Sequence, residues 1–189
     1  MKKAKDPEKI FLVGFSGSGK STIGPLLAAR LGRFYVDTDR VIAEKFGKDI
    51  PGIFADDGEE AFRAAETEVL GEIAGRAGVR EVVVLGGGAF TIAVNRDLVR
   101  RAGIAVYIQC SVRELARRMR RHADRPLLTV VPNPGESLPE ATRRRVAELL
   151  EERREFYLLA DMTVSSTARL PVSVVEEIVR KLENRYEPS

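Results

Sequence analysis

Short apolar runs alternate with longer amphipathic segments along the 189-residue chain. Short runs without polar alternation are typical of strands buried on both faces of a parallel sheet. The segments between them repeat apolar residues at helical spacing. The apolar runs occupy residues 10–13, 33–36, 82–85, 104–108 and 162–164. This alternation predicts an α/β fold, a three-layer α-β-α sandwich around a five-stranded parallel sheet.

The segments between the strands carry helix start and stop signals. Helices are expected at residues 22–31, 40–46, 51–54, 57–73, 95–101, 140–159 and 172–182. Ser111, followed three residues later by Glu114, predicts a capping box at the start of one more helix. Residues 125–139 contain four prolines and a glycine, so they cannot form one continuous helix.

Residues 14–21 read GFSGSGKS and match the phosphate-loop pattern G-x-x-x-x-G-K-[ST] at every fixed position. An apolar strand precedes this segment and an amphipathic helix follows it, which is the context that the motif requires. The glycines let backbone N–H groups point at a phosphate, and the helix N-terminus adds partial positive charge. Lys20 can reach the outer phosphates, and Ser21 can offer its hydroxyl to Mg²⁺.

Polar or glycine-rich residues follow the next two strands. Asp37 and Asp39 come after the second strand, and Gly86, Gly87 and Gly88 come after the third. Ligands bind at the carboxyl ends of the strands in such sheets, so we expect these residues and the phosphate loop to line one cleft. One carboxylate can hold the water shell of magnesium while the other accepts a hydrogen bond from an attacking hydroxyl. The alternative role of these carboxylates is to cap the helix that starts near Arg40.

Composition indicates a globular protein with a small-molecule ligand. The chain is 44% hydrophobic and 31% charged, with a net charge of +3. Arginines cluster at residues 113–125 and 143–154, but glutamates alternate with them as on solvated helix faces, so we expect no nucleic-acid partner. The single cysteine, Cys110, excludes an internal disulfide, and we assign no role to the single histidine, His122. No apolar run approaches about 18 residues, so we expect a cytoplasmic protein without a membrane span.

Several further motifs occur in an order that resembles the shikimate kinases, a family of P-loop kinases in the nucleoside monophosphate kinase-like group. The matching segments are residues 14–22, 37–39, 53–66 (IFADDGEEAFRAAE), 86–89 (GGGA), 117–118, 125–128 (RPLL) and 169–171. The resemblance covers nearly the whole chain. It implies a single domain over residues 1–189 with a lid at about 119–140, acting as a monomer without nucleic-acid or membrane partners.

The resemblance also implies an activity, the ATP-dependent phosphorylation of the 3-hydroxyl of shikimate. On the acceptor side, Asp39 resembles the general base, and Arg63 resembles an arginine that grips the shikimate carboxylate, with Glu66 behind it. Arg153 is the best match to a second carboxylate-binding arginine, with Arg154 as the alternative. The remaining acceptor-side residues implied by the resemblance are the apolar walls Phe54 and Phe62 and the backbone of Gly86, Gly87 and Gly88.

On the donor side, the resemblance implies that ATP and Mg²⁺ bind together. Lys20 and the lid arginine, Arg125, would stabilise the transferring phosphate. Ser21 would bind magnesium directly and Asp37 would bind it through water. The remaining ATP-binding residues implied are Gly17, Ser18, Gly19, Thr22, Arg118 and Arg169, with Pro171 beside the adenine. Two alternatives stay open, a kinase for another small polyol acid such as gluconate and a non-catalytic sensor of the same fold.

Overall fold

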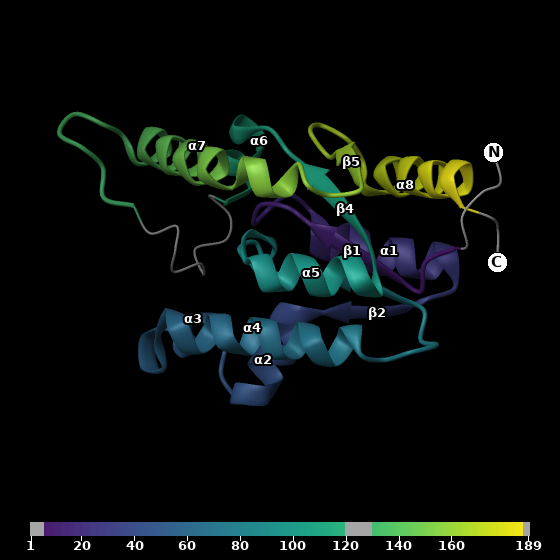
Figure 1. The fold of residues 1–189 in the computed structure, drawn as a ribbon. Coiled ribbons are helices and arrows are strands. Elements are labelled where there is room, and N and C mark those ends of the chain that lie inside the picture. The colour runs from purple at the N-terminus through teal and green to yellow at the C-terminus, as the bar shows by residue number, and fades with distance from the viewer. Residues whose placement is uncertain (1–5, 120–129, 187–189) are drawn as a thin grey trace.

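A computed structural model describes residues 6–119 and 130–186 of the chain (Figure 1). Five parallel strands form one sheet in the order β2-β3-β1-β4-β5. The strands are β1 (Lys9–Val13), β2 (Phe34–Asp37), β3 (Glu81–Val84), β4 (Gly103–Gln109) and β5 (Met162–Ser165). The helices are α1 (Lys20–Leu31), α2 (Thr38–Phe46), α3 (Ile50–Asp56), α4 (Gly58–Ala74), α5 (Ala93–Ala102), α6 (Val112–Met119), α7 (Leu138–Tyr157) and α8 (Pro171–Arg185), with a 3₁₀ turn η1 (Ala89–Thr91). The predicted five-stranded α/β sandwich is confirmed.

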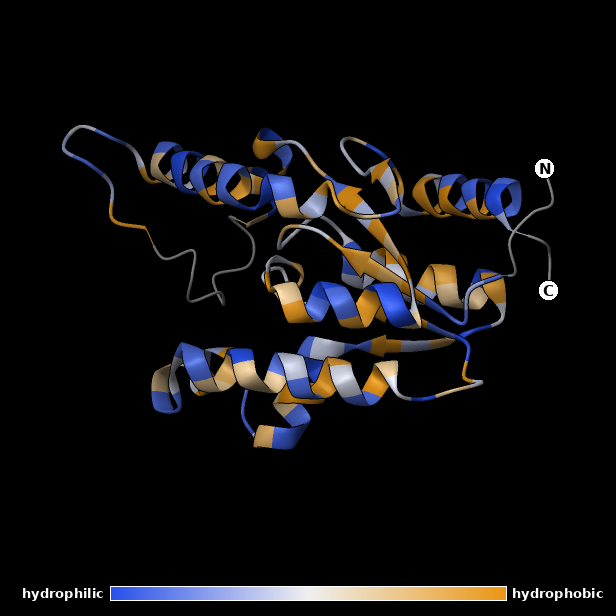
Figure 2. Cartoon of the chain, viewed as in Figure 1, coloured by the Kyte–Doolittle hydropathy of each residue, from blue (hydrophilic) through white to orange (hydrophobic). Residues whose placement is uncertain are grey.

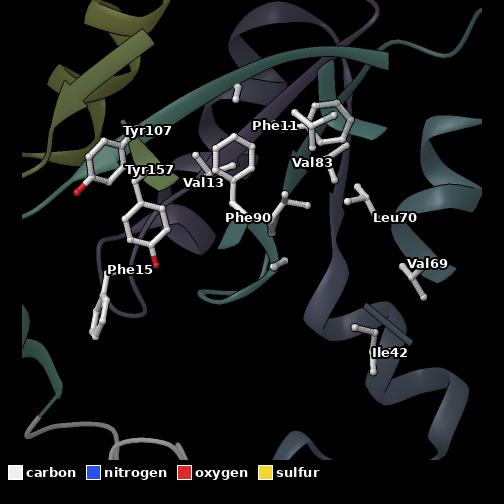
Figure 3. Packing of buried hydrophobic residues seen from close by; sticks show 14 of the residues in the cluster. Phe11, Val13, Phe15, Ile42, Val69, Leu70, Val83, Phe90, Tyr107 and Tyr157 are labelled. Carbon is white, nitrogen blue, oxygen red and sulfur yellow. The ribbon is translucent and has the colours of Figure 1, made fainter. Parts of the chain in front are cut away.

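The central strand β1 divides the interior into two cores because side chains alternate across a strand. Ile10 and Leu12 belong to a core shared with α1 and α8. Phe11 and Val13 belong to a second core, shared with α4, α5 and α7. Figure 2 shows the apolar strands between helices that alternate hydrophilic and hydrophobic positions, and Figure 3 shows the second core around Phe11 and Phe90. The sheet is therefore covered on both faces, as its unbroken apolar strands predict.

One local prediction is wrong. Ser111 Oγ accepts a hydrogen bond from the Glu114 N–H (3.3 Å), which is half of the predicted capping box. The Glu114 carboxylate does not return to Ser111, because it pairs with Arg117 and Arg118 on the same helix. The Ser111 N–H donates instead to Thr167 Oγ1 (2.9 Å). A complete capping box stands at Ser137 and Glu140, before α7.

The expected lid at about 119–140 is described at residue 119, where α6 ends, and from residue 130 onward. His122, Arg125 and the rest of residues 120–129 lie outside the described residues. The predictions made for them therefore stay predictions. None of the helices that the structure describes is long and apolar enough to span a membrane.

Candidate functional site

The phosphate loop joins β1 to α1 and adopts a conformation that depends on glycine. Gly14, Gly17 and Gly19 have φ angles of +136°, +80° and +102°, which side-chain-bearing residues rarely adopt. Lys20, the first residue of α1, is buried, and its Nζ donates to the carbonyl oxygens of Gly14 (2.7 Å) and Phe15 (3.0 Å). The lysine charge therefore sits inside the curl of the loop, against a helix N-terminus.

The two aspartates lie at the boundary between β2 and α2. Asp37 caps α2, because its Oδ1 accepts a hydrogen bond from the Asp39 N–H (3.1 Å). Its other oxygen accepts from the Tyr35 hydroxyl (3.2 Å). Helix capping is therefore one role of the Asp37 carboxylate, and the same side chain also lines a cavity. Asp39 stands in the first turn of α2, where the helix dipole favours a negative charge.

The first residue of the triple-glycine segment packs directly against two carboxylates. The Gly86 N–H donates to Thr38 Oγ1 (3.2 Å), which ties the end of β3 to α2. A methyl group on Gly86 would lie 2.6 Å from Asp39 Oδ1 and 2.5 Å from Glu66 Oε1. Glycine at this position thus lets both carboxylates approach the backbone.

The next two glycines contact the phosphate loop and an arginine. A methyl group on Gly87 would lie 3.0 Å from the Ser16 nitrogen. On Gly88 it would lie 2.7 Å from Arg63 Nη1. The segment is therefore a wall of bare backbone against which three different parts of the site pack.

Arg63 on α4 is held by carboxylates on both sides of its guanidinium group. Its Nη1 donates a hydrogen bond to the Glu66 carboxylate. Its Nε and Nη2 donate to Glu59 Oε1 at 3.2 and 3.1 Å. Burial raises the pKa of Glu66 to about 7, although the positive charge of Arg63 acts in the opposite direction. The arginine is thus oriented before any ligand arrives, beside a carboxyl group that titrates near neutral pH.

Two cavities adjoin these residues. The first, of about 510 Å³, is here named the arginine cavity. Its lining includes Phe15, Ser16, Asp37, Arg40, Asp49, Phe54, Phe62, Arg63, Glu66, Gly86, Gly88 and Arg153. The second, of about 620 Å³, is named the phosphate-loop cavity. Its lining includes Gly17, Ser18, Gly19, Lys20, Thr22, Arg118, Ser166, Arg169 and Pro171. Ser21, Asp39 and Gly87 line both cavities, so the two cavities meet there.

The structure separates the two candidate arginines on α7. Arg153 lines the arginine cavity, and the central carbon of its guanidinium group lies 5.7 Å from the centre of the Phe15 ring. Arg154 is largely exposed and pairs with Glu151 on the same helix (3.7 Å). Consecutive helical residues point about 100° apart, so only one of the two can face the cavity.

The phosphate-loop cavity brings together most of the residues assigned to nucleotide binding. Arg118 on α6 donates to the carbonyl oxygens of Gly17 and Ser166, each at 3.2 Å. Arg169 donates to the carbonyl oxygen of Ser165 (3.1 Å), the last residue of β5. Both arginines thus line the same cavity as the phosphate loop, although they are 51 positions apart in the chain.

Two residues of the site were not assigned a role from the sequence. Phe15, within the phosphate loop, is buried beside Arg153. Tyr157, which ends α7, is fully buried, and its hydroxyl donates to the Gly87 carbonyl oxygen (2.5 Å). The sequence signal for Tyr157 was its place four residues after Arg153, which served only to choose that arginine and gave the tyrosine no role of its own.

The chain also resembles known proteins over nearly its whole length. The family model for shikimate kinase matches residues 16–183. A shikimate kinase from Chlorobium chlorochromatii is 48% identical over 183 residues, covering 96% of this chain and 94% of the relative. A shikimate kinase from Chlorobaculum parvum is 45% identical, covering 92% and 91%.

Solved structures agree with this assignment. The structure of shikimate kinase from Acinetobacter baumannii in complex with shikimate has a TM-score of 0.85 and 34% identity, covering 95% of each chain. A gluconokinase from Sinorhizobium meliloti has a TM-score of 0.57 at 24% identity, which shows a shared fold alone. With a matching family model, a phosphate loop and these relatives, the chain belongs to the shikimate kinase family.

Proposed function

We propose that this protein transfers the γ-phosphoryl group of ATP to the 3-hydroxyl of shikimate, giving shikimate 3-phosphate and ADP. One observation carries the proposal: a cavity beside the phosphate loop and a cavity lined by arginines meet at Ser21, Asp39 and Gly87. Phosphoryl transfer needs a donor and an acceptor brought into line at such a junction.

The arginine cavity suits a small hydroxylated carboxylic acid. Arg63 and Arg153 can bind the carboxylate of shikimate from two sides, since a guanidinium fork matches carboxylate geometry. The backbone of the glycine wall and the rings of Phe54 and Phe62 can bound the apolar part of the ring. Asp39, at the junction, then faces the hydroxyl groups.

The phosphate-loop cavity suits ATP. The backbone N–H groups from Gly17 to Thr22 can bind the phosphates, while Arg118 and Arg169 lie where the adenine end would rest. Arg125, expected to reach the transferring phosphate, lies outside the described residues and stays a prediction.

The oxygen donors at the junction fit Mg²⁺. Ser21 offers a hydroxyl and Asp37 a carboxylate, and both line the arginine cavity. Hard oxygen ligands together with substrate phosphates and water are what Mg²⁺ prefers. When bound, the ion would neutralise charge on the phosphates.

Asp39 is the group in position to accept the hydroxyl proton as the acceptor attacks in line. Lys20 supplies positive charge from the loop, so the protein contributes mainly positioning and preorganised electrostatics.

The test is the transfer of phosphate from ATP to shikimate, with gluconate and quinate as competing acceptors and the product identified by mass spectrometry. Shikimate should be the preferred acceptor, and product from gluconate alone would overturn the assignment. Asp39→Asn should lower kcat by on the order of 10²- to 10⁴-fold while ATP binding persists. Asp97→Asn is the matched control, because Asp97 lies on the surface and pairs with Arg100 (2.6 Å). Near-normal turnover in Asp39→Asn would exclude Asp39 as the base.

A further inference from the structure

Tyr157 is the last residue of α7, and its side chain is fully buried. Its ring stacks on Tyr107 of β4 with the ring centres 5.1 Å apart. Figure 3 shows the two rings side by side with their hydroxyl groups pointing in different directions. The stacking fixes the Tyr157 ring, so its hydroxyl has a defined position.

That hydroxyl donates to the carbonyl oxygen of Gly87 across 70 positions of sequence, at 2.5 Å. This distance is at the short end for an O–H···O hydrogen bond. Gly87 is the glycine that packs against Ser16 of the phosphate loop and lines both cavities. The hydrogen bond therefore holds the glycine wall at the junction between the two cavities.

Arg153 stands one helical turn before Tyr157 on α7. Burial raises the pKa of Tyr157, and the interaction with the Arg153 guanidinium group opposes this rise in part. Residues four apart lie on the same face of a helix, so Arg153 and Tyr157 approach the site together. The guanidinium group of Arg153 also lies over the Phe15 ring, 5.7 Å from its centre. One phenolic oxygen thus adjoins both the arginine and the backbone wall of the arginine cavity.

We propose that the Tyr157 hydroxyl is a positioning group for the acceptor. It fixes the position of Arg153 relative to Gly87, so that the carboxylate-binding arginine and the ring-binding glycine wall can bind the same acceptor molecule. This inference rests on the proposed function, since it assumes a carboxylate acceptor in the arginine cavity. Tyr157 itself acts through these two neighbours. The donor side should depend on it less than the acceptor side, because Arg153 lines the arginine cavity and is not among the residues that line the phosphate-loop cavity.

The test compares Tyr157→Phe with Tyr107→Phe. Tyr157→Phe keeps the stacked ring and removes only the hydroxyl, and Tyr107→Phe removes the hydroxyl of the partner ring. The first variant should raise KM for shikimate on the order of 10-fold and leave KM for ATP within about twofold of wild type. Calorimetric titration with shikimate alone should show the same loss of affinity. The second variant should match wild type in both constants.

A double variant, Tyr157→Phe with Arg153→Ala, tests whether the Tyr157 hydroxyl affects shikimate binding through Arg153. Its increase in KM for shikimate should be smaller than the product of the two single increases, because the hydroxyl acts partly through the arginine. If the KM increase of the double variant equals the product of the two single increases, the hydroxyl does not act through Arg153. An unchanged KM for shikimate in Tyr157→Phe, equal changes for both substrates, or a variant that no longer folds would each overturn the positioning role. Failure of the wild-type protein to phosphorylate shikimate would instead refute the proposed function.

Discussion

A methyl group at Gly86 should disable turnover without disturbing the fold. In Gly86→Ala the added carbon would lie 2.6 Å from Asp39 Oδ1 and 2.5 Å from Glu66 Oε1, whereas ordinary contact begins near 3.4 Å. The Gly86 backbone is outside the left-handed region, so alanine fits the chain and only the carboxylates must give way. The Asp39 oxygen would have to move by roughly 0.8 Å, and a displacement of that order can cost about 10²-fold in rate.

Steady-state measurement of ADP formation with saturating ATP and shikimate tests this directly. We expect kcat to fall on the order of 10²-fold, while KM for ATP stays near wild type. Gly71→Ala is the matched control, since Gly71 is inside α4 and the added carbon would have no atom within 4 Å apart from its chain neighbours and the local backbone of that helix. It should leave kcat unchanged and raise the free energy of unfolding by about 0.4–1 kcal/mol. If Gly86→Ala retains kcat within about twofold of wild type, the close packing of Asp39 on the glycine wall does not position it for catalysis.

Two further predictions concern charge. Because burial raises the pKa of Glu66 from 4.5 to about 7, the folded state binds this proton more tightly than the unfolded state. The free energy of unfolding should therefore fall as pH rises through that window, by up to ~3 kcal/mol for this group, and level off above it. Urea titrations from pH 4.5 to 8 should show a shallower fall for Glu66→Gln, and equal slopes would contradict the assignment. Arg153→Ala should raise KM for shikimate by about 10-fold or more. Arg154→Ala removes an exposed side chain and should leave KM for shikimate within about twofold of wild type. The reverse order of the two KM values would assign carboxylate binding to Arg154.

Most of the fold was predictable because each strand and helix carries its own signal. Strands buried on both faces must be apolar throughout, and the amphipathic segments between them must turn one face inward. The phosphate loop was predictable because only glycine adopts the required φ angles freely. The capping box at Ser111 was predicted incorrectly because a local pattern does not reveal the competing arginine partners of Glu114.

The location of the candidate site was predictable because several of its residues follow the carboxyl ends of strands. Asp37, Asp39 and the glycine segment follow neighbouring strands, and parallel strands present their carboxyl ends at one edge of the sheet. Spacing relative to Tyr157 favoured Arg153 but kept Arg154 open, so the sequence did not settle the choice between them. The choice depends on the rotation of α7 about its axis, which the packing of Tyr157 and its neighbours on the core decides.

The linear chain thus determined which chemical groups are present and at which edge of the sheet they gather, because these follow from short-range pattern and from the parallel topology. Only the tertiary structure decided how those groups contact one another. The hydrogen bond from Tyr157 to Gly87 and the packing of two carboxylates on Gly86 join segments that lie far apart in the chain. Such contacts depend on how whole helices dock on the sheet, and docking is set by the summed burial of many side chains, which no single motif records.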